Sequence, residues 1–361
     1  MKNFKFPKTH KPFSDKYFLR AKEILIKEKL NPMVKCQVFL RSEGRLYGIN
    51  EAIACIMNYV SDKDNIKIHA LKEGYNYSNT ETIMTIESPI QNIIDLETMY
   101  LGIISRETTL KNGDEDIDLK DIENRMREIK FLIGDRPYFY FGARGWCYSR
   151  DAEISKACFE GGASECSTDI GAKTVGKQGI GTSPHCLQTI YHWKQGLDEA
   201  VCGSTKAFDK HIDPKVPRIA LVDYANREVI DTLKTLFTLD KKLSGIRIDT
   251  CGENVMEPLS KNSPKGVTVD GVSTLQFILK GLATGGMHKP KVFLSSGFSN
   301  INKVKEFIQA ETALGIKLFD GLGGGIVNSR RTTMDIFQVE DKKINKVGRS
   351  EKKNDRLKRV I

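Results

Sequence analysis

The sequence lacks several patterns that would place it in a familiar class at once. No apolar run approaches the ~20 residues that a membrane span needs, and the basic first residues carry no apolar segment of a secretory signal. The eight cysteines include no pair with CxxC spacing, which disfavours a zinc ribbon or a thioredoxin-like centre. There is no repeat and no low-complexity tract, and the glycines of residues 176–181 lack the GxxxxGK[ST] order of a P-loop. These absences predict a cytoplasmic protein whose cysteines are mostly buried thiols.

Length and charge set broad limits on what the chain can do. The 361 residues suffice for two domains, and a hydrophobic content of 40% supports a sizeable core. The formal net charge is +10, and a positive potential attracts small anionic substrates. Residues 342–361 contain nine Lys or Arg against only Glu351 and Asp355. Such a block is usually a solvated tail, and nucleic-acid binding is the less favoured interpretation.

The first hundred residues mix helices with strands. Apolar alternation predicts strands near residues 34–40 and 66–71, and residues 95–105 have the pattern of a partly buried helix. The acidic, polar stretch of residues 112–118 indicates a boundary loop. Near the other end of the chain, residues 334–339 have the pattern of a strand that returns to this first domain.

Beyond residue 113 short apolar runs alternate with helical segments. Buried parallel strands are expected at residues 138–141, 219–222, 246–248, 292–294 and 316–319, and helices at 227–237, 272–282 and 303–314. Strand–helix alternation of this length is typical of an α/β barrel or an open doubly wound sheet. Both architectures place the active site at the carboxyl ends of the strands.

Two glycine-rich turns follow expected strands. They are Ser295-Ser-Gly-Phe298 and Asp320-Gly-Leu-Gly-Gly-Gly325. Glycines let consecutive backbone N–H groups approach a phosphate, and barrels often bind phosphate after their last strands. Either turn alone is equally well explained as a tight βα connection, but the pair favours phosphate binding.

Charged side chains follow other strands. Arg247 and Asp249 lie on the same side of one strand, and Asp223 follows the strand before it. Carboxylates there would hold a ribose diol or a metal-bound diphosphate, although for Arg247 and Asp249 taken alone an ordinary ion pair is the favoured explanation. Arg144 would meet a phosphate or carboxylate, whereas a lone histidine such as His185 is usually structural.

The ordered motifs of this chain resemble those of the nicotinate phosphoribosyltransferases. The motifs that carry the resemblance are Ser14-Asp-Lys-Tyr-Phe18, Leu96-Glu-Thr98, Ser105-Arg106, Phe141-Gly-Ala-Arg144, Gly161-Gly-Ala-Ser-Glu-Cys-Ser167, Gly181-Thr-Ser-Pro-His185, Ile246-Arg-Ile-Asp249, Ser295-Ser-Gly297 and Asp320-Gly-Leu-Gly-Gly324. Each motif is weak alone, but the ordered set spans residues 14–340 and is specific.

The resemblance implies a type II phosphoribosyltransferase architecture. An irregular seven-stranded α/β barrel over residues 113–330 would follow an N-terminal α/β sandwich-like domain over residues 1–112, completed by residues 331–345 and followed by a basic tail over 342–361. The implied reaction joins nicotinate to phosphoribosyl diphosphate, giving nicotinate mononucleotide and diphosphate in NAD salvage. Mg²⁺ and ATP are the implied cofactor and co-substrate, and the implied assembly is a homodimer or larger homo-oligomer. Neither a membrane nor nucleic acid is expected as a partner.

The resemblance also assigns catalytic roles. His185 matches the histidine that takes the γ-phosphate of ATP in many members of the family. Asp223 and Asp249 match acidic positions near the ribose and the magnesium diphosphate, and either is a possible Mg²⁺ ligand, although Mg²⁺ is expected mainly through the diphosphate. Arg247 matches an arginine that contacts the pyridine or a phosphate.

Substrate-binding positions carry over in the same way. Arg144 matches a position facing nicotinate and diphosphate, with Ser167 in the adjacent motif and Arg106 in an earlier one. Tyr17 matches an aromatic residue that stacks on the pyridine of a neighbouring subunit, so we expect it to complete the site of another chain. The 5′-phosphate turns would include Ser296, Gly297, Gly323 and Gly324.

Three departures from the family pattern bear on the phosphate site and on a cysteine cluster. Phe298 stands where a second glycine is usual, so it is expected to crowd the turn, and Phe298→Gly is expected to preserve or improve activity. Ile326 replaces a common threonine and removes a hydroxyl donor. No cysteine follows Cys251, so the C-terminal cysteine cluster of some members is absent.

Other functions remain open from the residues. Nicotinamide or quinolinate would serve the same chemistry as nicotinate. A Schiff-base aldolase would need a strand-borne lysine, and neither Lys291 nor Lys317 lies at the carboxyl end of an expected strand. A nucleic-acid-binding protein would depend on the basic residues 342–361.

Overall fold

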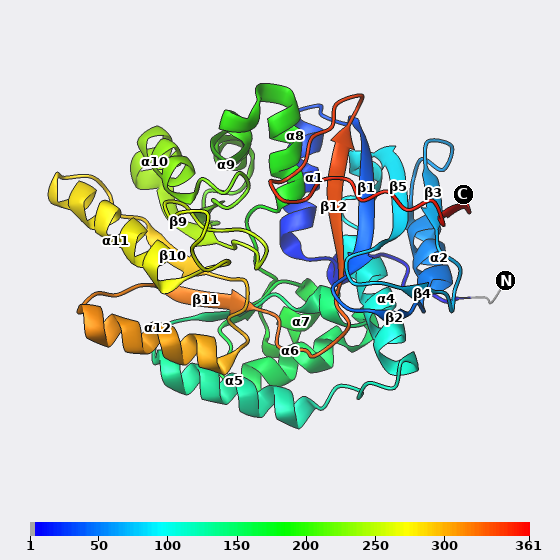
Figure 1. Cartoon of the computed structure of the whole chain (residues 1–361), viewed down its shortest axis with the longest axis horizontal. Coiled ribbons are helices and arrows are strands. Elements are labelled where there is room, and N and C mark those ends of the chain that lie inside the picture. The colour runs from blue at the N-terminus through cyan, green and yellow to red at the C-terminus, as the bar shows by residue number, and fades with distance from the viewer. Residues whose placement is uncertain (1–3) are drawn as a thin grey trace.

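The computed structural model describes residues 4–361 and contains two main sheets (Figure 1). The first is antiparallel and has five strands in the order β12-β1-β5-β3-β13. Its strands are β1 (Met33–Leu40), β3 (Lys67–Ala70), β5 (Thr82–Pro89), β12 (Thr332–Val339) and β13 (Lys358–Arg359). The strands expected near residues 34–40, 66–71 and 334–339 are therefore confirmed, and β12 pairs with β1 across about three hundred residues of sequence.

Helices and short elements surround this antiparallel sheet. The long helices are α1 (Lys16–Lys27), α2 (Ile49–Tyr59) and α4 (Glu97–Lys111), and α3 (Ile90–Ile93) is a single turn. A two-stranded ribbon joins β2 (Gly44–Arg45) to β4 (Asn76–Tyr77). Helix α4 is buried along most of its length because it packs against α2, β12 and the segment after β6, so it lies between the two sheets.

The second sheet is parallel and has six strands in the order β7-β6-β11-β10-β9-β8. The strands are β6 (Tyr138–Tyr140), β7 (Glu165–Cys166), β8 (Arg218–Leu221), β9 (Leu243–Ile248), β10 (Lys291–Leu294) and β11 (Gly321–Gly324). The helices are α5 (Leu119–Ile133), α6 (Asp151–Glu160), α7 (Asp169–Ala172), α8 (His185–Gln195), α9 (Ala200–His211), α10 (Glu228–Leu239), α11 (Val269–Thr284) and α12 (Ile301–Leu314). Single 3₁₀ turns lie at Lys11–Phe13, Ala143–Gly145, Tyr148–Arg150, Lys173–Val175, Leu197–Glu199 and Asp240–Lys242.

The parallel sheet is a curled half-barrel, so the expected seven-stranded barrel is not confirmed. Strands β7 and β8 each have one strand partner in the part of the chain that the structure describes. The chain between them is helical, and in α8 the buried Leu187, Ile190 and Tyr191 recur at helical spacing. A segment whose apolar residues follow that period buries them as a helix and leaves no strand to close the barrel.

One strand lies a few residues beyond its expected place. Residues 316–319 were expected to form it, but the paired strand is β11, which contains three glycines. A Cβ at Gly321 would lie 2.9 Å from a Pro137 side-chain atom, and one at Gly323 would lie 2.7 Å from the Phe141 ring. Only glycine fits this close approach, so β11 lacks the apolar pattern by which a strand is found.

The C-terminal residues are anchored against the first sheet, although most of their side chains are exposed. Strand β13 pairs with β3, the Thr82 hydroxyl donates to the Lys352 carbonyl at 2.6 Å, and the Lys346 side chain is only 6% exposed. Figure 1 shows this segment leaving β12, turning beside α8 and then crossing β1 and β5. The segment is not a free tail, because the edge of β3 and the polar side chains of the sheet supply partners for its backbone. Most of its basic side chains are nevertheless exposed, as the charge pattern predicts.

Two further expectations can be compared with the structure. All eight cysteines are buried free thiols, as predicted. Within residues 4–361, none of the helices combines the length and apolar character that crossing a membrane requires.

Candidate active site

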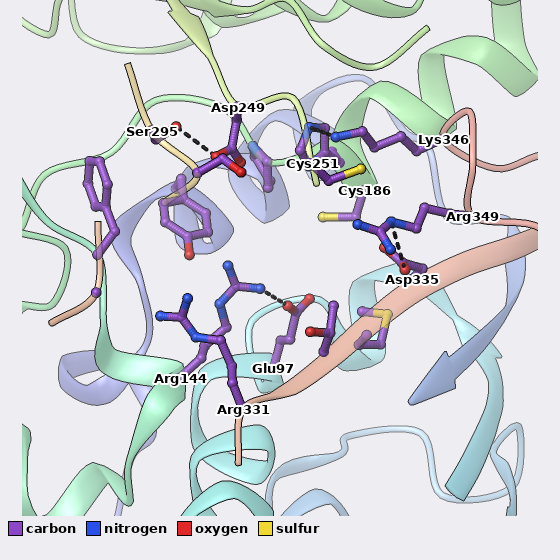
Figure 2. A pocket seen from close by; sticks show the side chains of 18 of the residues that line it. Glu97, Arg144, Cys186, Asp249, Cys251, Ser295, Arg331, Asp335, Lys346 and Arg349 are labelled. Atoms are coloured by element: carbon purple, nitrogen blue, oxygen red, sulfur yellow. Dashed lines mark hydrogen bonds and ion pairs between the residues drawn. The ribbon is translucent and has the colours of Figure 1, made fainter. Parts of the chain in front are cut away.

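A cavity of about 430 Å³ lies where the carboxyl ends of the parallel strands face the antiparallel sheet. Figure 2 shows Arg144 and Arg331 side by side on one wall, across from Asp249 and Ser295. The cavity is lined by residues from both sheets, because α1, α4 and β12 approach the half-barrel from the other side. Of the predicted site residues, it contains Tyr17, Arg144, His185, Arg247, Asp249, Ser296, Gly297 and Gly324.

The turn after β10 has the geometry of an anion site. Gly297 has φ 93° and Ser296 has φ 67°, a conformation that consecutive residues adopt when their N–H groups point to one side. The Lys303 ammonium donates to the Ser296 carbonyl at 3.1 Å, and helix α12 begins directly after the turn. Gly324 of the neighbouring strand lines the same cavity. Glycine backbone, a helix N-terminus and an ammonium together favour phosphate.

Asp249, Ser295 and Arg247 form a connected group at the ends of β9 and β10. The Ser295 hydroxyl donates to Asp249 Oδ1 at 2.8 Å, and an Arg247 guanidinium nitrogen lies 3.7 Å from Asp249 Oδ2. The Asp249 side chain is 28% exposed, so its carboxylate faces the cavity while its neighbours hold it in place. The expected placement of Arg247 and Asp249 on one side of the strand is confirmed.

Arg144 lies among aromatic and acidic side chains on the opposite wall. Its guanidinium donates to Glu97 Oε1 at 2.5 Å and stands 5.7 Å from the Phe18 ring centre, whose edge meets Tyr17. Asp15 is a second carboxylate, 3.7 Å away. Burial raises the pKa of Glu97 to about 7, because desolvation outweighs the attraction of Arg144.

Arg331 is a cation in the cavity that ion pairing leaves free. Its side chain is exposed to the cavity, and no carboxylate of residues 4–361 lies within ion-pair distance of it. The other four arginines of the lining each contact a carboxylate. Gly325 adjoins the Arg331 guanidinium and leaves no room for a side chain there. Arg331 is therefore placed to bind an anion.

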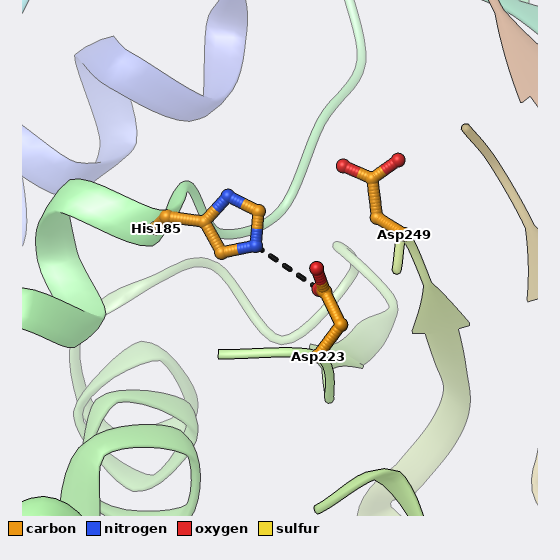
Figure 3. A group of neighbouring side chains, drawn as sticks. All are labelled: His185, Asp223 and Asp249. Carbon is orange, nitrogen blue, oxygen red and sulfur yellow. Dashed lines mark hydrogen bonds and ion pairs between the residues drawn. The ribbon is translucent and has the colours of Figure 1, made fainter. Parts of the chain in front are cut away.

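His185, Asp223 and Lys346 meet behind the cavity. His185 Nε2 lies 3.0 Å from Asp223 Oδ1 (Figure 3) and 3.1 Å from the Lys346 ammonium, which also pairs with Asp223. Burial lowers the pKa of His185, and the Lys346 charge lowers it further. Burial alone would raise the pKa of Asp223, but Lys346 and His185 outweigh it, so that the pKa is lowered and the carboxylate stays ionised. Potential ligand atoms of His185, Asp223 and Asp249 lie within 4.8 Å of one another.

Comparison with known proteins finds a partial family match and a shared fold for this arrangement. Residues 15–108 match the model of the N-terminal domain of quinolinate phosphoribosyl transferase. Nicotinate phosphoribosyltransferase from Porphyromonas gingivalis aligns with a TM-score of 0.69 over 93% of this chain and 92% of that chain, at 12% identity. The chain has the type II phosphoribosyltransferase fold. For the Vibrio cholerae nicotinate phosphoribosyltransferase the TM-score is 0.66, with 93% and 88% of the chains covered and 12% identity. Nicotinate-nucleotide pyrophosphorylase from Pyrococcus furiosus has 26% identity over 98% of this chain and 82% of that one, with a TM-score of 0.47.

Four predicted site residues of this phosphoribosyltransferase fold do not line the cavity. Asp223 is fully buried and is linked to the cavity through His185 and Lys346, and Ser167 is buried beneath the start of α1. Gly323 faces the Phe141 ring. Arg106 pairs with Glu107 on the outer side of α4, because the preceding residue, not Arg106, turns inward on the helix.

The placement of Tyr17 differs from the sequence expectation. It lines the cavity that holds Asp249 of its own chain, and the edge of its ring packs against Gly181. The Lys16 N–H donates to the Ser167 carbonyl at 2.7 Å, and Asp15 forms a bridge with Thr168, so the start of α1 is tied to the half-barrel of the same chain. No second subunit is needed to bring Tyr17 to the site.

The two departures in the phosphate motif have structural explanations. Phe298 is fully buried and meets Phe307 edge to face at 5.0 Å, so its ring leaves the turn open instead of crowding it. Ile326 is 1% exposed and packs in the core, while its carbonyl accepts from Arg125 at 2.9 Å. Both side chains replace polar or small family residues with core packing.

Sequence reasoning missed several residues of the cavity. Glu97 lies within a quoted motif, but its role as the partner of Arg144 depends on tertiary contact. Arg331 follows the last glycine turn by six residues, and this closeness in sequence was the signal that could have identified it. Lys346 and Arg349 had no such signal, because in the sequence they are two of many basic residues near the C-terminus.

Proposed function

We propose that this protein is a nicotinate phosphoribosyltransferase that forms nicotinate mononucleotide and diphosphate from nicotinate and phosphoribosyl diphosphate. The observation that carries the proposal is one cavity containing a phosphate-binding turn at Gly297, a carboxylate at Asp249 and the arginines Arg144, Arg247 and Arg331. Phosphoribosyl diphosphate needs these groups because it has phosphates at both ends of a ribose. The N-terminal family match and the fold support the same enzyme class.

The residues suggest how each part of the substrates binds. The Ser296–Gly297 backbone and Lys303 would hold the 5′-phosphate, and Asp249 would accept hydrogen bonds from the ribose hydroxyls. Arg331, which lacks a carboxylate partner, would bind the diphosphate. The ring-binding end would be formed by Tyr17, where aromatic contact contributes ~0.5–1.5 kcal/mol beyond the buried area.

The chemistry follows from where charge develops. Departure of diphosphate from the anomeric carbon leaves oxocarbenium character on the ribose, and the negative charge of Asp249 stabilises it. Arg247 and Arg331 stabilise the leaving diphosphate from fixed positions. The pyridine nitrogen is already a nucleophile, so the protein needs to supply orientation and no general base.

Mg²⁺ fits this site through part of the candidate cluster. Asp249 presents a partly exposed carboxylate to the cavity, whereas Asp223 is already paired with Lys346. Mg²⁺ bound with the diphosphate would neutralise part of its charge. ATP coupling is proposed through His185, which lines the cavity with its side chain 27% exposed. A homodimeric assembly and a cytoplasmic location remain predictions.

A single carboxylate on the pyridine suits the ring-binding end best. Nicotinate offers one carboxylate to Arg144, whose charge is already shared with Glu97 and Asp15. Nicotinamide would lose one charge-assisted pair, ~1.5–3 kcal/mol. Quinolinate would bring a second negative charge toward the same carboxylates. The N-terminal match to a quinolinate enzyme nevertheless makes quinolinate the second candidate.

The proposal is tested by measuring diphosphate release and mononucleotide formation with each pyridine. The purified protein is given phosphoribosyl diphosphate, Mg²⁺ and nicotinate, nicotinamide or quinolinate, with and without ATP. The highest kcat/KM is expected for nicotinate, and Asp249→Asn is expected to abolish turnover with every pyridine. Equal kcat/KM values for nicotinate and nicotinamide, or turnover of quinolinate alone, would overturn the assignment.

A further inference from the structure

Lys346 reaches the site on a segment anchored to both sheets. On the half-barrel side, the Val347 N–H donates to the Tyr224 carbonyl at 3.1 Å, and Asn254 donates to the Val347 carbonyl at 3.0 Å. On the antiparallel side, Gln37 donates to the Ser350 carbonyl at 2.9 Å. The backbone around Lys346 is therefore fixed from both directions, and its side chain enters the protein between the two sheets (Figure 2).

The Lys346 ammonium is buried with its partners. Its side chain is 6% exposed and that of Asp223 is 0% exposed. A buried ammonium is costly unless charged and polar groups surround it, and here Asp223 pairs with it while His185 Nε2 lies 3.1 Å away. The mechanism proposed above gives no task to this buried charge, although it lines the cavity.

The Lys346 ammonium adjoins a cluster of three side chains with the spacing of a metal site. His185, Asp223 and Asp249 present ligand atoms within 4.8 Å of one another, a spacing suited to a metal ion. Two of the three, His185 and Asp223, are in contact with the Lys346 ammonium. An ammonium is not a metal ligand, and a divalent cation beside it would be repelled across a few ångströms.

We propose that Lys346 is the resident cation of this cluster, positioning Asp223 and His185 and excluding divalent ions from them. Mg²⁺ then enters only together with the diphosphate of the substrate, a corollary that rests on the proposed function. The exclusion of divalent ions does not rest on the proposed function, because it concerns the protein without substrate. Lys346 is a positioning residue, since it acts through Asp223 and His185.

The test uses Mn²⁺ as a spectroscopic probe of the divalent site, followed by electron paramagnetic resonance in the absence of substrate. The wild-type protein is expected to have no Mn²⁺ site that depends on Asp249. Lys346→Met removes the charge and keeps much of the side-chain volume. It leaves Asp223 and His185 beside Asp249 without the ammonium that they contact in the wild type, so we expect it to gain one Mn²⁺ site, about tenfold or more tighter than any in the wild type.

Matched variants define the outcome. Lys346→Met combined with Asp249→Asn should lose the new site, and Lys346→Arg should never gain it because it keeps the charge. Lys343→Met is the control, since Lys343 is 74% exposed and, among residues 4–361, pairs only with Glu351 at 3.4 Å. It should match the wild type in Mn²⁺ binding and in turnover.

Two results would overturn the proposal: a wild-type Mn²⁺ site that Asp249→Asn removes, or a folded Lys346→Met variant without a new site. Circular dichroism establishes folding, and if Lys346→Met does not fold, the wild-type and Asp249→Asn titrations still decide. A gained Mn²⁺ site in a protein that turns over no pyridine would reject the proposed function and keep this inference. Turnover of nicotinate by the wild type, with no Mn²⁺ site gained in Lys346→Met, would keep the proposed function and reject this inference.

Discussion

Replacing Phe298 should weaken the fold, contrary to what its position in the motif suggests. The ring is fully buried, meets Phe307 edge to face and lies 4.8 Å from the Lys303 ammonium. Removing a buried phenylalanine side chain costs about 3–5 kcal/mol, because the transfer energy is lost and a cavity remains. Glycine at this position would add about 0.4–1 kcal/mol through the unfolded chain. The free energy of unfolding of a native protein is only about 5–15 kcal/mol, so this loss is a large share of it.

The measurement is equilibrium unfolding of Phe298→Ala and Phe298→Gly in denaturant, with the melting temperature as a second readout. A loss of this size lowers Tm by roughly 10 °C in a domain of 150–250 residues. Phe298→Met preserves most of the volume and should cost less than about 1.5 kcal/mol. Phe131→Ala is the matched control, because Phe131 is 86% exposed and should change stability by less than about 0.5 kcal/mol.

The same substitution should also affect the proposed phosphate site. Phe298 directly follows Gly297, and its ring packs on helix α12, which carries Lys303. In Phe298→Ala molecules that remain folded, the KM for phosphoribosyl diphosphate should therefore rise more than the KM for the pyridine. A Phe298→Gly protein as stable as the wild type and with tighter phosphoribosyl diphosphate binding would refute this reasoning and restore the crowded-turn interpretation.

Three further predictions concern single side chains. Arg331→Met should raise the KM for phosphoribosyl diphosphate about ten- to a hundredfold through loss of a charge-assisted contact. The exposed Arg127→Met should leave it unchanged, and equal effects of the two would contradict the role of Arg331. His185→Ala should retain basal product formation and lose stimulation by ATP, whereas retained stimulation would return His185 to a structural role. Burial raises the pKa of Glu97 from 4.5 to about 7, so the folded state binds its proton more tightly, and the unfolding free energy should fall by about 3 kcal/mol as pH rises from 4.5 to 7. Glu97→Gln should flatten that part of the unfolding profile, and an unchanged slope would contradict the assignment.

Local pattern was sufficient for much of the fold. The strands β1, β8, β9 and β10 have period-two or continuous apolar runs, and α10, α11 and α12 have helical spacing, so each is visible within a short window. The apolar pattern of a strand is missing where neighbouring residues leave room only for glycine. Strand β11 is built from glycines because Pro137 and Phe141 approach its backbone, and no propensity scale favours a strand there.

The residues of the candidate site show the same difference between local pattern and tertiary contact. Arg247, Asp249, Ser296 and Gly297 were predictable because each lies at or just beyond the carboxyl end of a parallel strand, and these ends share one edge of a sheet. The sequence also predicted a strand at residues 334–339 that returns to the first domain, and the pairing of β12 with β1 confirms it. The sequence did not indicate that β12 would bring Arg331 and Asp335 into the cavity.

The sequence by itself determined the strand ends, the glycine turns and the order of the motifs, because these depend on neighbours a few residues apart. Only the tertiary structure decided which charges meet. Glu97 reaches Arg144 across 47 positions, and Lys346 reaches Asp223 across 123. Only the packing of one sheet against the other closes such distances. A basic residue near the C-terminus looks solvated in sequence, since nothing local marks the one lysine that becomes buried beside a carboxylate.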